Sequence, residues 1–188
     1  MTGMVNTAKL LLASLVLGTI LACGGSGGGG GGTTGATKLG YTNPTTGDFR
    51  LEATGGAGTG TITLALKGPS TVRARGVDFG LTADSAKTRF VNQGGSNYAS
   101  NGAVFDLGNA PMIFKAVLDG SSVRVSMGQK GNTVGAKSLD GTIATVQLQI
   151  QSGAQAGAVS LSALPATVLL EDGNERPVTV SVGTLEAQ

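Results

Sequence analysis

Strict alternation of apolar and polar side chains is the feature that most constrains the fold of this chain. It runs through four stretches, residues 61–66, 123–127, 143–150 and 178–182. Successive side chains of a β-strand point to opposite faces, so each stretch would place one face on a core and the other in water. No stretch of ten or more residues carries a convincing apolar stripe of helical period. The pattern therefore predicts an all-β chain from about Leu39 onward.

Shorter apolar runs and the turns between them complete this prediction. Further strands are expected at 49–53, 73–81, 103–106, 113–118, 158–161 and 167–170. Asp119-Gly120 predicts a tight hairpin joining 113–118 to 122–127, because Asp-Gly is the favoured pair where a turn needs positive φ. Asp172-Gly173-Asn174 predicts another turn, and residues 84–87 could form one helical turn. Strands at this spacing, with Gly-rich turns, are typical of an antiparallel β-sandwich.

Composition excludes several classes of function. The 13 Lys and Arg residues nearly balance the 11 Asp and Glu residues, which leaves no basic stripe for nucleic acid. The chain has no His, which rules out Ser-His-Asp and Cys-His catalysis and zinc sites built on imidazole. No pair of carboxylates is singled out by spacing either. We therefore expect a protein that is not an enzyme.

The N-terminal segment predicts export. Lys9 precedes an apolar stretch of about 12 residues, Leu10 to Leu21, whereas a membrane-spanning helix needs roughly 20. The stretch closes with Ile20-Leu21-Ala22-Cys23, which resembles the bacterial lipoprotein signal, or lipobox. That resemblance implies cleavage before Cys23 and its diacylation, with palmitate among the acyl chains. The alternative is an ordinary signal peptide cut after Ala22, with Cys23 a free thiol.

The chain then divides into three parts. Residues 1–22 are the expected signal peptide, and residues 23–38 hold the lipidated cysteine and a flexible Gly-rich linker. A flexible tract of this kind spans about 20 Å. Residues 39–188 form the single expected domain. Because Gly24, and not Asp, follows the cysteine, the lipoprotein resemblance is compatible with the outer membrane of the cell envelope.

Three segments of the expected domain together resemble a family. They are Val77-Asp78-Phe79-Gly80-Leu81-Thr82-Ala83-Asp84, Leu139-Asp140-Gly141-Thr142-Ile143-Ala144-Thr145-Val146-Gln147-Leu148, and Ala154-Gln155-Ala156-Gly157. They look like an early strand, a late strand and a turn of cohesin-type domains. The resemblance implies a jelly-roll β-sandwich related to bacterial carbohydrate-binding modules. It also implies non-catalytic recognition or scaffolding of another envelope or surface protein.

Carbohydrate binding is the alternative function. Four phenylalanines lie in strand patterns that predict core positions: Phe49, Phe79, Phe105 and Phe114. Tyr98 lies instead in the polar loop 92–102, where its ring could stack on a sugar. The neighbouring amides Asn92, Gln93, Asn97 and Asn101 could then bind sugar hydroxyls. Alternatively, Tyr98 only covers the end of the sandwich.

Two further groups of polar residues are candidate binding sites. Glu171, Asp172 and Asn174 gather the oxygen ligands that Ca²⁺ prefers, although their spacing is not that of an EF-hand and the segment is also an ordinary turn. No other metal or cofactor is expected. Arg73 and Arg75 share one strand face and could bind a partner's carboxylates, or could form a solvated edge that resists aggregation.

Overall fold

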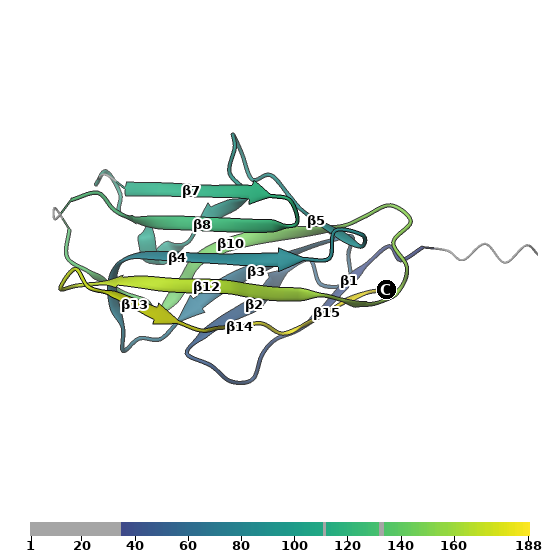
Figure 1. Ribbon diagram of the computed structural model, residues 1–188, viewed down its shortest axis with the longest axis horizontal. Helices are drawn as coiled ribbons and strands as arrows, with labels where there is room; N and C mark the ends of the chain where they lie inside the picture. Colours follow the sequence, from purple (N-terminus) through teal and green to yellow (C-terminus); the bar gives the residue numbers. More distant parts are fainter. Residues whose placement is uncertain (1–34, 111, 132–133) are drawn as a thin grey trace, which may run out of the picture. The chain divides into compact units, whose positions relative to one another are not determined.

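Two six-stranded sheets and one three-stranded sheet make up the folded chain (Figure 1). The computed structural model describes residues 35–110, 112–131 and 134–188. The expected signal peptide, Cys23 and the linker up to residue 34 lie outside these ranges. Over the ranges it describes, no helix is long and apolar enough to cross a membrane.

The first six-stranded sheet, here the β10 sheet, is built around its longest strand. Its order is β14-β2-β3-β10-β5, with β6 also paired to β10. The strands are β2 (Phe49–Gly55), β3 (Thr61–Gly68), β5 (Thr88–Phe90), β6 (Ala99–Asn101), β10 (Gly141–Ile150) and β14 (Val180–Ser181). Only the pairing of β14 with β2 is parallel among the described strand pairs.

The second six-stranded sheet, here the β4 sheet, lies in front of the β10 sheet in Figure 1. Its order is β13-β12-β4-β8-β7, with β9 also paired to β4. The strands are β4 (Arg73–Ala83), β7 (Met112–Asp119), β8 (Ser122–Gln129), β9 (Lys137–Ser138), β12 (Leu161–Leu170) and β13 (Glu175–Val178). The small sheet joins β1 (Leu39–Thr42), β15 (Thr184–Ala187) and β11 (Gly157–Val159).

The predicted alternation builds the core between the sheets. Ile62, Leu64 and Leu66 of β3 are at most 1% exposed, and Val123 and Val125 of β8 are fully buried. Burying one such side chain contributes about 1.5–3 kcal/mol. The four phenylalanines are where the sequence predicts: Phe49, Phe79 and Phe105 are buried, and Phe114 packs against the same cluster. The antiparallel β-sandwich is therefore confirmed.

The residues before β1 already bond to the sandwich. The amide of Ala36 donates to the carbonyl of Ala154 at 2.7 Å, and the amides of Thr37 and Lys38 donate to the carbonyl of Gln188 at 2.8 and 2.9 Å. These bonds hold the incoming chain against the loop before β11 and the last residue of the chain.

Both turn predictions hold, one with a shift of register. Asp119 pairs with Ser122, so the β7–β8 hairpin turns at Gly120 and Ser121 and not at Asp119-Gly120. Gly120 has φ of 58°, which L-residues with a Cβ rarely adopt. Asp172 to Asn174 also turn, between β12 and β13, with Gly173 at φ of 86°.

The expected strand at 103–106 is wrong. Ala103–Phe105 form a 3₁₀ turn, and the amide of Asp106 donates to the carbonyl of Ala103 at 3.2 Å. Val104 and Phe105 are both buried. A strand would have turned consecutive side chains to opposite faces, and a helical turn places both against the core.

Two strand boundaries were also wrong. The expected strand at 178–182 is broken at Thr179, because the chain leaves β12 and crosses to β2 in the other sheet. Conversely, the expected strands at 158–161 and 167–170 are redistributed: β11 ends at Val159, and β12 continues from Leu161 to Leu170. Pro165 fits inside β12 because the register with β4 shifts between Leu164 and Thr167.

Candidate functional site

The side of the β4 sheet that faces away from the β10 sheet, here the outer face, is ordered in rows across four strands. Ile113 of β7 is level with Gly128 of β8, Gly76 of β4 and Leu169 of β12. The second row is polar and consists of Lys115, Ser126, Asp78 and Thr167. The third row is apolar at its two ends and consists of Val117, Arg124, Gly80 and Leu164.

The outer face carries large exposed apolar side chains. Ile113 is 54% exposed and Val117 is 43% exposed, and the other large hydrophobic side chains of the described residues are at least partly buried. The two lie on β7, separated by Lys115. Sequence reasoning missed them, although the run Ile113-Phe114-Lys115-Ala116-Val117-Leu118 is apolar on both faces except at Lys115. A strand with one polar residue on its outward face was the available signal.

Two glycines form the floor of a shallow groove between Ile113 and Leu169. A Cβ on Gly76 would lie 2.9 Å from the carbonyl oxygen of Met127, and one on Gly128 would lie 2.9 Å from that of Arg75. The groove has a volume of about 210 Å³, and Asp78 and Ser126 line it with the glycines. Because neither glycine has a side chain, a partner could approach the backbone of β4 and β8.

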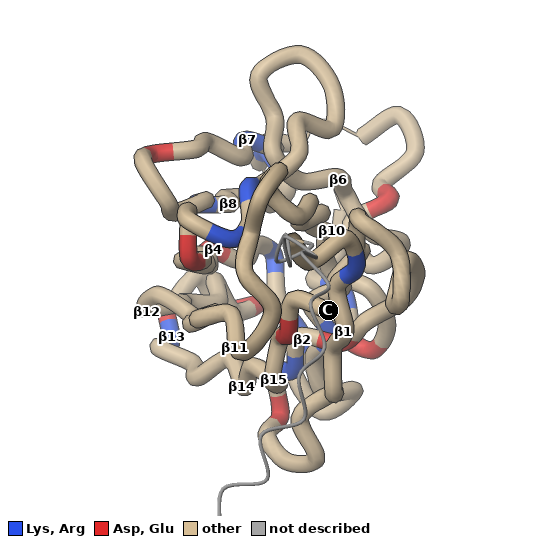
Figure 2. The backbone as a smooth tube through the Cα atoms, turned by 90° about the vertical axis from the view of Figure 1, so that its right-hand side faces the viewer, with Lys and Arg blue, Asp and Glu red and all other residues tan. Residues whose placement is uncertain are grey.

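Asp78 lies at the middle of the outer face and pairs there with Arg124 and Ser126. Its Oδ1 lies 3.1 Å from Nη1 of Arg124, and its Oδ2 accepts a hydrogen bond from the hydroxyl of Ser126. Both carboxylate oxygens of Asp78 therefore have partners within its own sheet. Elsewhere on the described chain, charged residues of both signs are spread over the strands (Figure 2).

Arg73 and Arg75 lie at one end of the outer face, and the expectation that they mark an edge is wrong. They belong to β4, which lies between β12 and β8. Nη2 of Arg73 donates to the carbonyl of Ala136 at 2.6 Å, and Nη1 of Arg75 donates to that of Val134 at 3.1 Å. Nε of Arg75 also donates to the carbonyl of Glu171 at 3.1 Å. The pair thus fastens two loops to the end of the sheet.

Tyr98 and Asn97 lie beside the edge of β7. Tyr98 is half-buried and packs against the core, and its amide donates to the carbonyl of Ala116 at 3.0 Å. Oδ1 of Asn97 accepts the amide of Ala116 at 3.0 Å. Both residues therefore bond to β7.

The other proposed sugar ligands also bond within the chain. Asn92 accepts the amide of Gly94 at 2.8 Å, and Gln93 donates to the carbonyl of Val91 at 3.3 Å. Asn101 belongs to β6, inside the expected loop, and donates to the carbonyl of Phe105 at 2.8 Å. The four amides are spread along the segment, each with its own partner. Sugar binding by this set stays a prediction.

The proposed calcium ligands lie in the exposed β12–β13 turn. Oδ1 of Asp172 accepts the amide of Asn174 at 3.0 Å, and Oδ2 accepts its side-chain amide at 2.9 Å. These bonds lower the pKa of the Asp172 carboxyl. Glu171 instead pairs with Arg73 at 3.4 Å. In the part of the chain that the structure describes, no three His, Cys, Asp or Glu residues are placed to hold a metal ion. Calcium binding stays a prediction.

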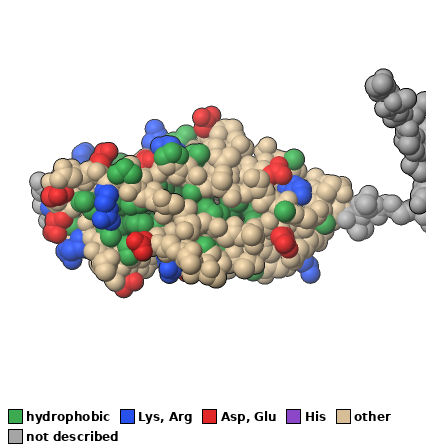
Figure 3. Space-filling view, turned by 60° about the horizontal axis from the view of Figure 1, so that its bottom comes forward, with side chains coloured by type: hydrophobic (Ala, Val, Ile, Leu, Met, Phe, Trp, Pro, Cys, Tyr) green, Lys and Arg blue, Asp and Glu red, His purple; other side chains and the backbone are tan. Residues whose placement is uncertain are grey.

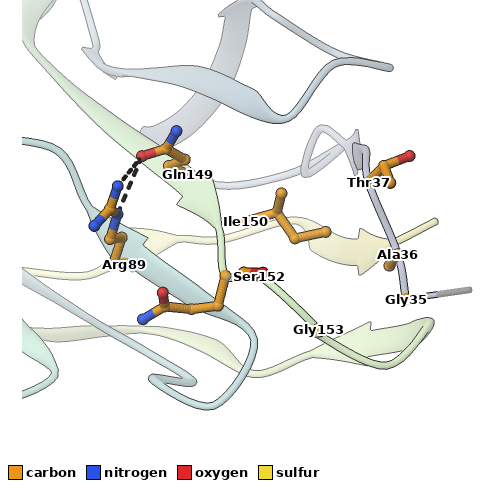
Figure 4. Close-up of a pocket in the computed structure, with 9 residues that line it drawn as sticks. Gly35, Ala36, Thr37, Arg89, Gln149, Ile150, Ser152 and Gly153 are labelled. Atoms are coloured by element: carbon orange, nitrogen blue, oxygen red, sulfur yellow. Dashed lines mark hydrogen bonds between the residues drawn. The ribbon is translucent and has the colours of Figure 1, made fainter.

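A hollow of about 550 Å³ lies where the chain enters the sandwich (Figure 4). Thr37, Ile150 and Gly153 line it, and Arg89 is the charged residue of its lining. Nε and Nη2 of Arg89 donate to Oε1 of Gln149 at 3.1 and 2.7 Å. The guanidinium is thus partly satisfied by a neighbouring strand.

Comparison with known proteins supports the fold through solved structures. No protein-family model matches the chain, and no curated protein matches it. The cohesin in a type II cohesin–X-dockerin complex of Acetivibrio cellulolyticus matches with a TM-score of 0.57 and 14% identity, over 73% of this chain and 95% of that one. The sixth cohesin of scaffoldin B from the same organism, in complex with a mutant dockerin, matches at 0.53 and 17%, over 80% and 97%.

A further neighbour is the second type II cohesin module of the adaptor scaffoldin ScaA, also from Acetivibrio cellulolyticus. Its TM-score is 0.52 and its identity 14%, over 77% of this chain and 91% of that one. The described domain therefore has a β-sandwich fold like that of cohesins. The resemblance drawn from the three sequence segments is confirmed at the level of the fold.

Proposed function

We propose that the sandwich is a non-catalytic protein-recognition module and that its outer face binds the partner. The observation that carries this proposal is the exposure of Ile113 and Val117 beside the glycine-floored groove. When a partner covers large apolar side chains that are otherwise in water, the free energy of the complex is lowered.

The surroundings of these side chains suit a protein partner. Lys115, Arg124 and Asp78 supply charge among the apolar positions, which would fix the orientation of a bound protein. Two structural neighbours are cohesins in complex with dockerins. A dockerin is therefore the first defined partner to test by calorimetry.

We further propose that the module is held at the cell envelope by lipid. Acylated Cys23 would anchor the chain, and the Gly-rich residues after it would hold the sandwich a short distance from the outer membrane. One acyl chain gives only marginal membrane binding, whereas two anchor a protein stably.

The test of recognition is affinity capture from solubilised envelope with the full chain as bait. Ile113→Asp places a charge in the proposed contact and should weaken capture of the partner at least about tenfold. Thr54→Asp is the matched control, because Thr54 is exposed on β2 of the other sheet. Equal capture by the two variants would reject the outer face as the binding surface.

A further inference from the structure

One edge of the β4 sheet is left open over half its length. β13 pairs with β12 only from Ala166 to Leu169, after which the chain passes through Thr179 to β14 in the other sheet. Residues 161–165 of β12 therefore have β4 on one side and no strand on the other among the described residues. Strands β12 and β14 lie in the lower half of the molecule in Figure 1.

The register of β12 shows which backbone groups face this open side. The amide of Asp84 donates to the carbonyl of Ser160, and Thr82 is paired with Ser162, so the backbone groups of the two serines point toward β4. Successive residues of an antiparallel strand alternate in direction. Leu161 and Ala163 hence present their amides and carbonyls to the open side.

A groove runs along this edge. It has a volume of about 490 Å³, with residues 161–165 as one wall and residues 178–182 as the other. Val178, Val180 and Val182 line the second wall, and none of the lining residues is charged. Figure 3 shows the molecule with this lower side turned forward, where hydrophobic atoms lie among uncharged atoms along the middle and charged side chains stand toward the ends and the rims.

These features select an extended segment as the occupant. The free amides and carbonyls repeat every second residue, which matches the spacing of another strand. The uncharged lining would leave a charged side chain without a partner, so the segment must be uncharged. A second copy of the domain is a poorer fit, because its own residues 161–165 are flanked by its own residues 178–182, and that flank would have to enter the groove beside the added strand.

We propose that this groove, here the β12 groove, binds an extended, uncharged, apolar segment of a partner protein by strand addition to residues 161–165. Main-chain hydrogen bonds to Leu161 and Ala163 would supply affinity, and the valines of the opposite wall would select apolar side chains. Pro165 has no amide and limits the added strand to a few residues. The site is distinct from the Ile113 and Val117 surface.

The test uses an end-capped seven-residue peptide of alternating threonine and valine as the probe. Its binding to the full chain is followed by amide hydrogen exchange of Leu161 and Ala163. We expect a dissociation constant below about 1 mM. We also expect exchange at these two amides to slow at least about tenfold on saturation, because each would enter a hydrogen bond. Ser162, already bonded to β4, should change little.

Two variants make the outcome specific. Thr179→Glu places a charge at the exposed rim of the groove and should weaken probe binding at least about tenfold, whereas Thr184→Glu, exposed but outside the lining, should not. Absence of binding at about 1 mM, or binding without protection of Leu161 and Ala163, would overturn the proposal. So would slow exchange of both amides in a dimer without the probe, which would assign the edge to a second copy. None of these results bears on Ile113, so the outer-face proposal is tested separately.

Discussion

At the scale of single residues, the 92–98 loop protects the edge of β7 with one side chain and one backbone amide. The amide and carbonyl of Ala116 face that edge and are taken by the side chain of Asn97 and the amide of Tyr98, each at 3.0 Å. An uncovered edge strand is a template for pairing with another chain. The side chain of Asn97 thus accepts the hydrogen bond that a neighbouring strand would otherwise accept from the amide of Ala116.

Asn97→Ala should lower the free energy of unfolding by about 1–2 kcal/mol, because the amide of buried Ala116 loses its acceptor. Urea denaturation of the wild type and the variant would measure this. Asn92→Ala is the control, since Asn92 is exposed and water can replace its bonds. Equal stability of the two variants would show that the cap contributes nothing.

Tyr41 of the small sheet links three segments: β1, β2 and the residues just before β15. Its hydroxyl donates to the carbonyl of Leu51 at 2.9 Å and accepts the amide of Gly183 at 2.7 Å. Burial is the main cause that raises the pKa of the Tyr41 phenol above its usual value. The folded chain therefore favours the neutral phenol.

This shift predicts a pH dependence. The stabilisation is complete below the usual phenol pKa of about 10 and is lost as the pH rises from there through the raised folded pKa. The unfolding free energy of the wild type should thus fall over this range more steeply than that of Tyr41→Phe. Below pH 9 the variant should be about 1–2 kcal/mol less stable, because two hydrogen bonds are lost. Parallel pH profiles for the two proteins would contradict this account, and Tyr98→Phe serves as the control.

At the scale of elements, the packing of β4 against β8 depends on facing glycines. Gly76 is level with Gly128, and an added Cβ on Gly128 would lie 3.0 Å from the Cα of Gly76. Neither glycine has positive φ, so the requirement is for space and not for backbone freedom. The close approach also leaves room for the groove on the outer face.

Gly76→Ala should lower the unfolding free energy by about 1–3 kcal/mol, because its Cβ would lie 2.9 Å from the carbonyl oxygen of Met127. Gly55→Ala, in β2, is the matched control, since no atom lies within 4 Å of its added Cβ. Thermal unfolding of both variants measures the difference. If both variants lose the same free energy of unfolding, the close approach of β4 and β8 does not require glycine at position 76.

At the scale of the whole molecule, we propose that a lipid anchor at Cys23 is joined to a domain that recognises a partner protein. Cys23→Ser should abolish incorporation of labelled palmitate and release the protein from the membrane fraction, because no acyl chain can be attached. Immunoblots of fractionated cells would report both. Retention of the variant in the outer membrane would show that another feature anchors the chain.

Sequence by itself determined the longer strands and most of their core faces, but not the short strands such as β5, β6 and β9. The period of two at residues 61–66 and 123–127 is a local property, and the side chains it turns inward are the buried ones. Local turn chemistry likewise placed the β7–β8 hairpin within one residue. The 3₁₀ turn at Ala103–Phe105 was missed because two adjacent buried side chains fit either a short strand or a turn.

Only the tertiary structure decided which strands are neighbours, and with them the two candidate binding surfaces. Strand pairing joins residues far apart in the chain, so no local pattern shows that β4 is central, that Asn97 caps Ala116, or that the chain leaves β12 at Thr179. The exposure of Ile113 and Val117 follows from the same arrangement, because an apolar residue is inside or outside only relative to the sheet that covers it. Alternation specifies two faces for each strand, but the order of the strands determines which faces and edges are left in water.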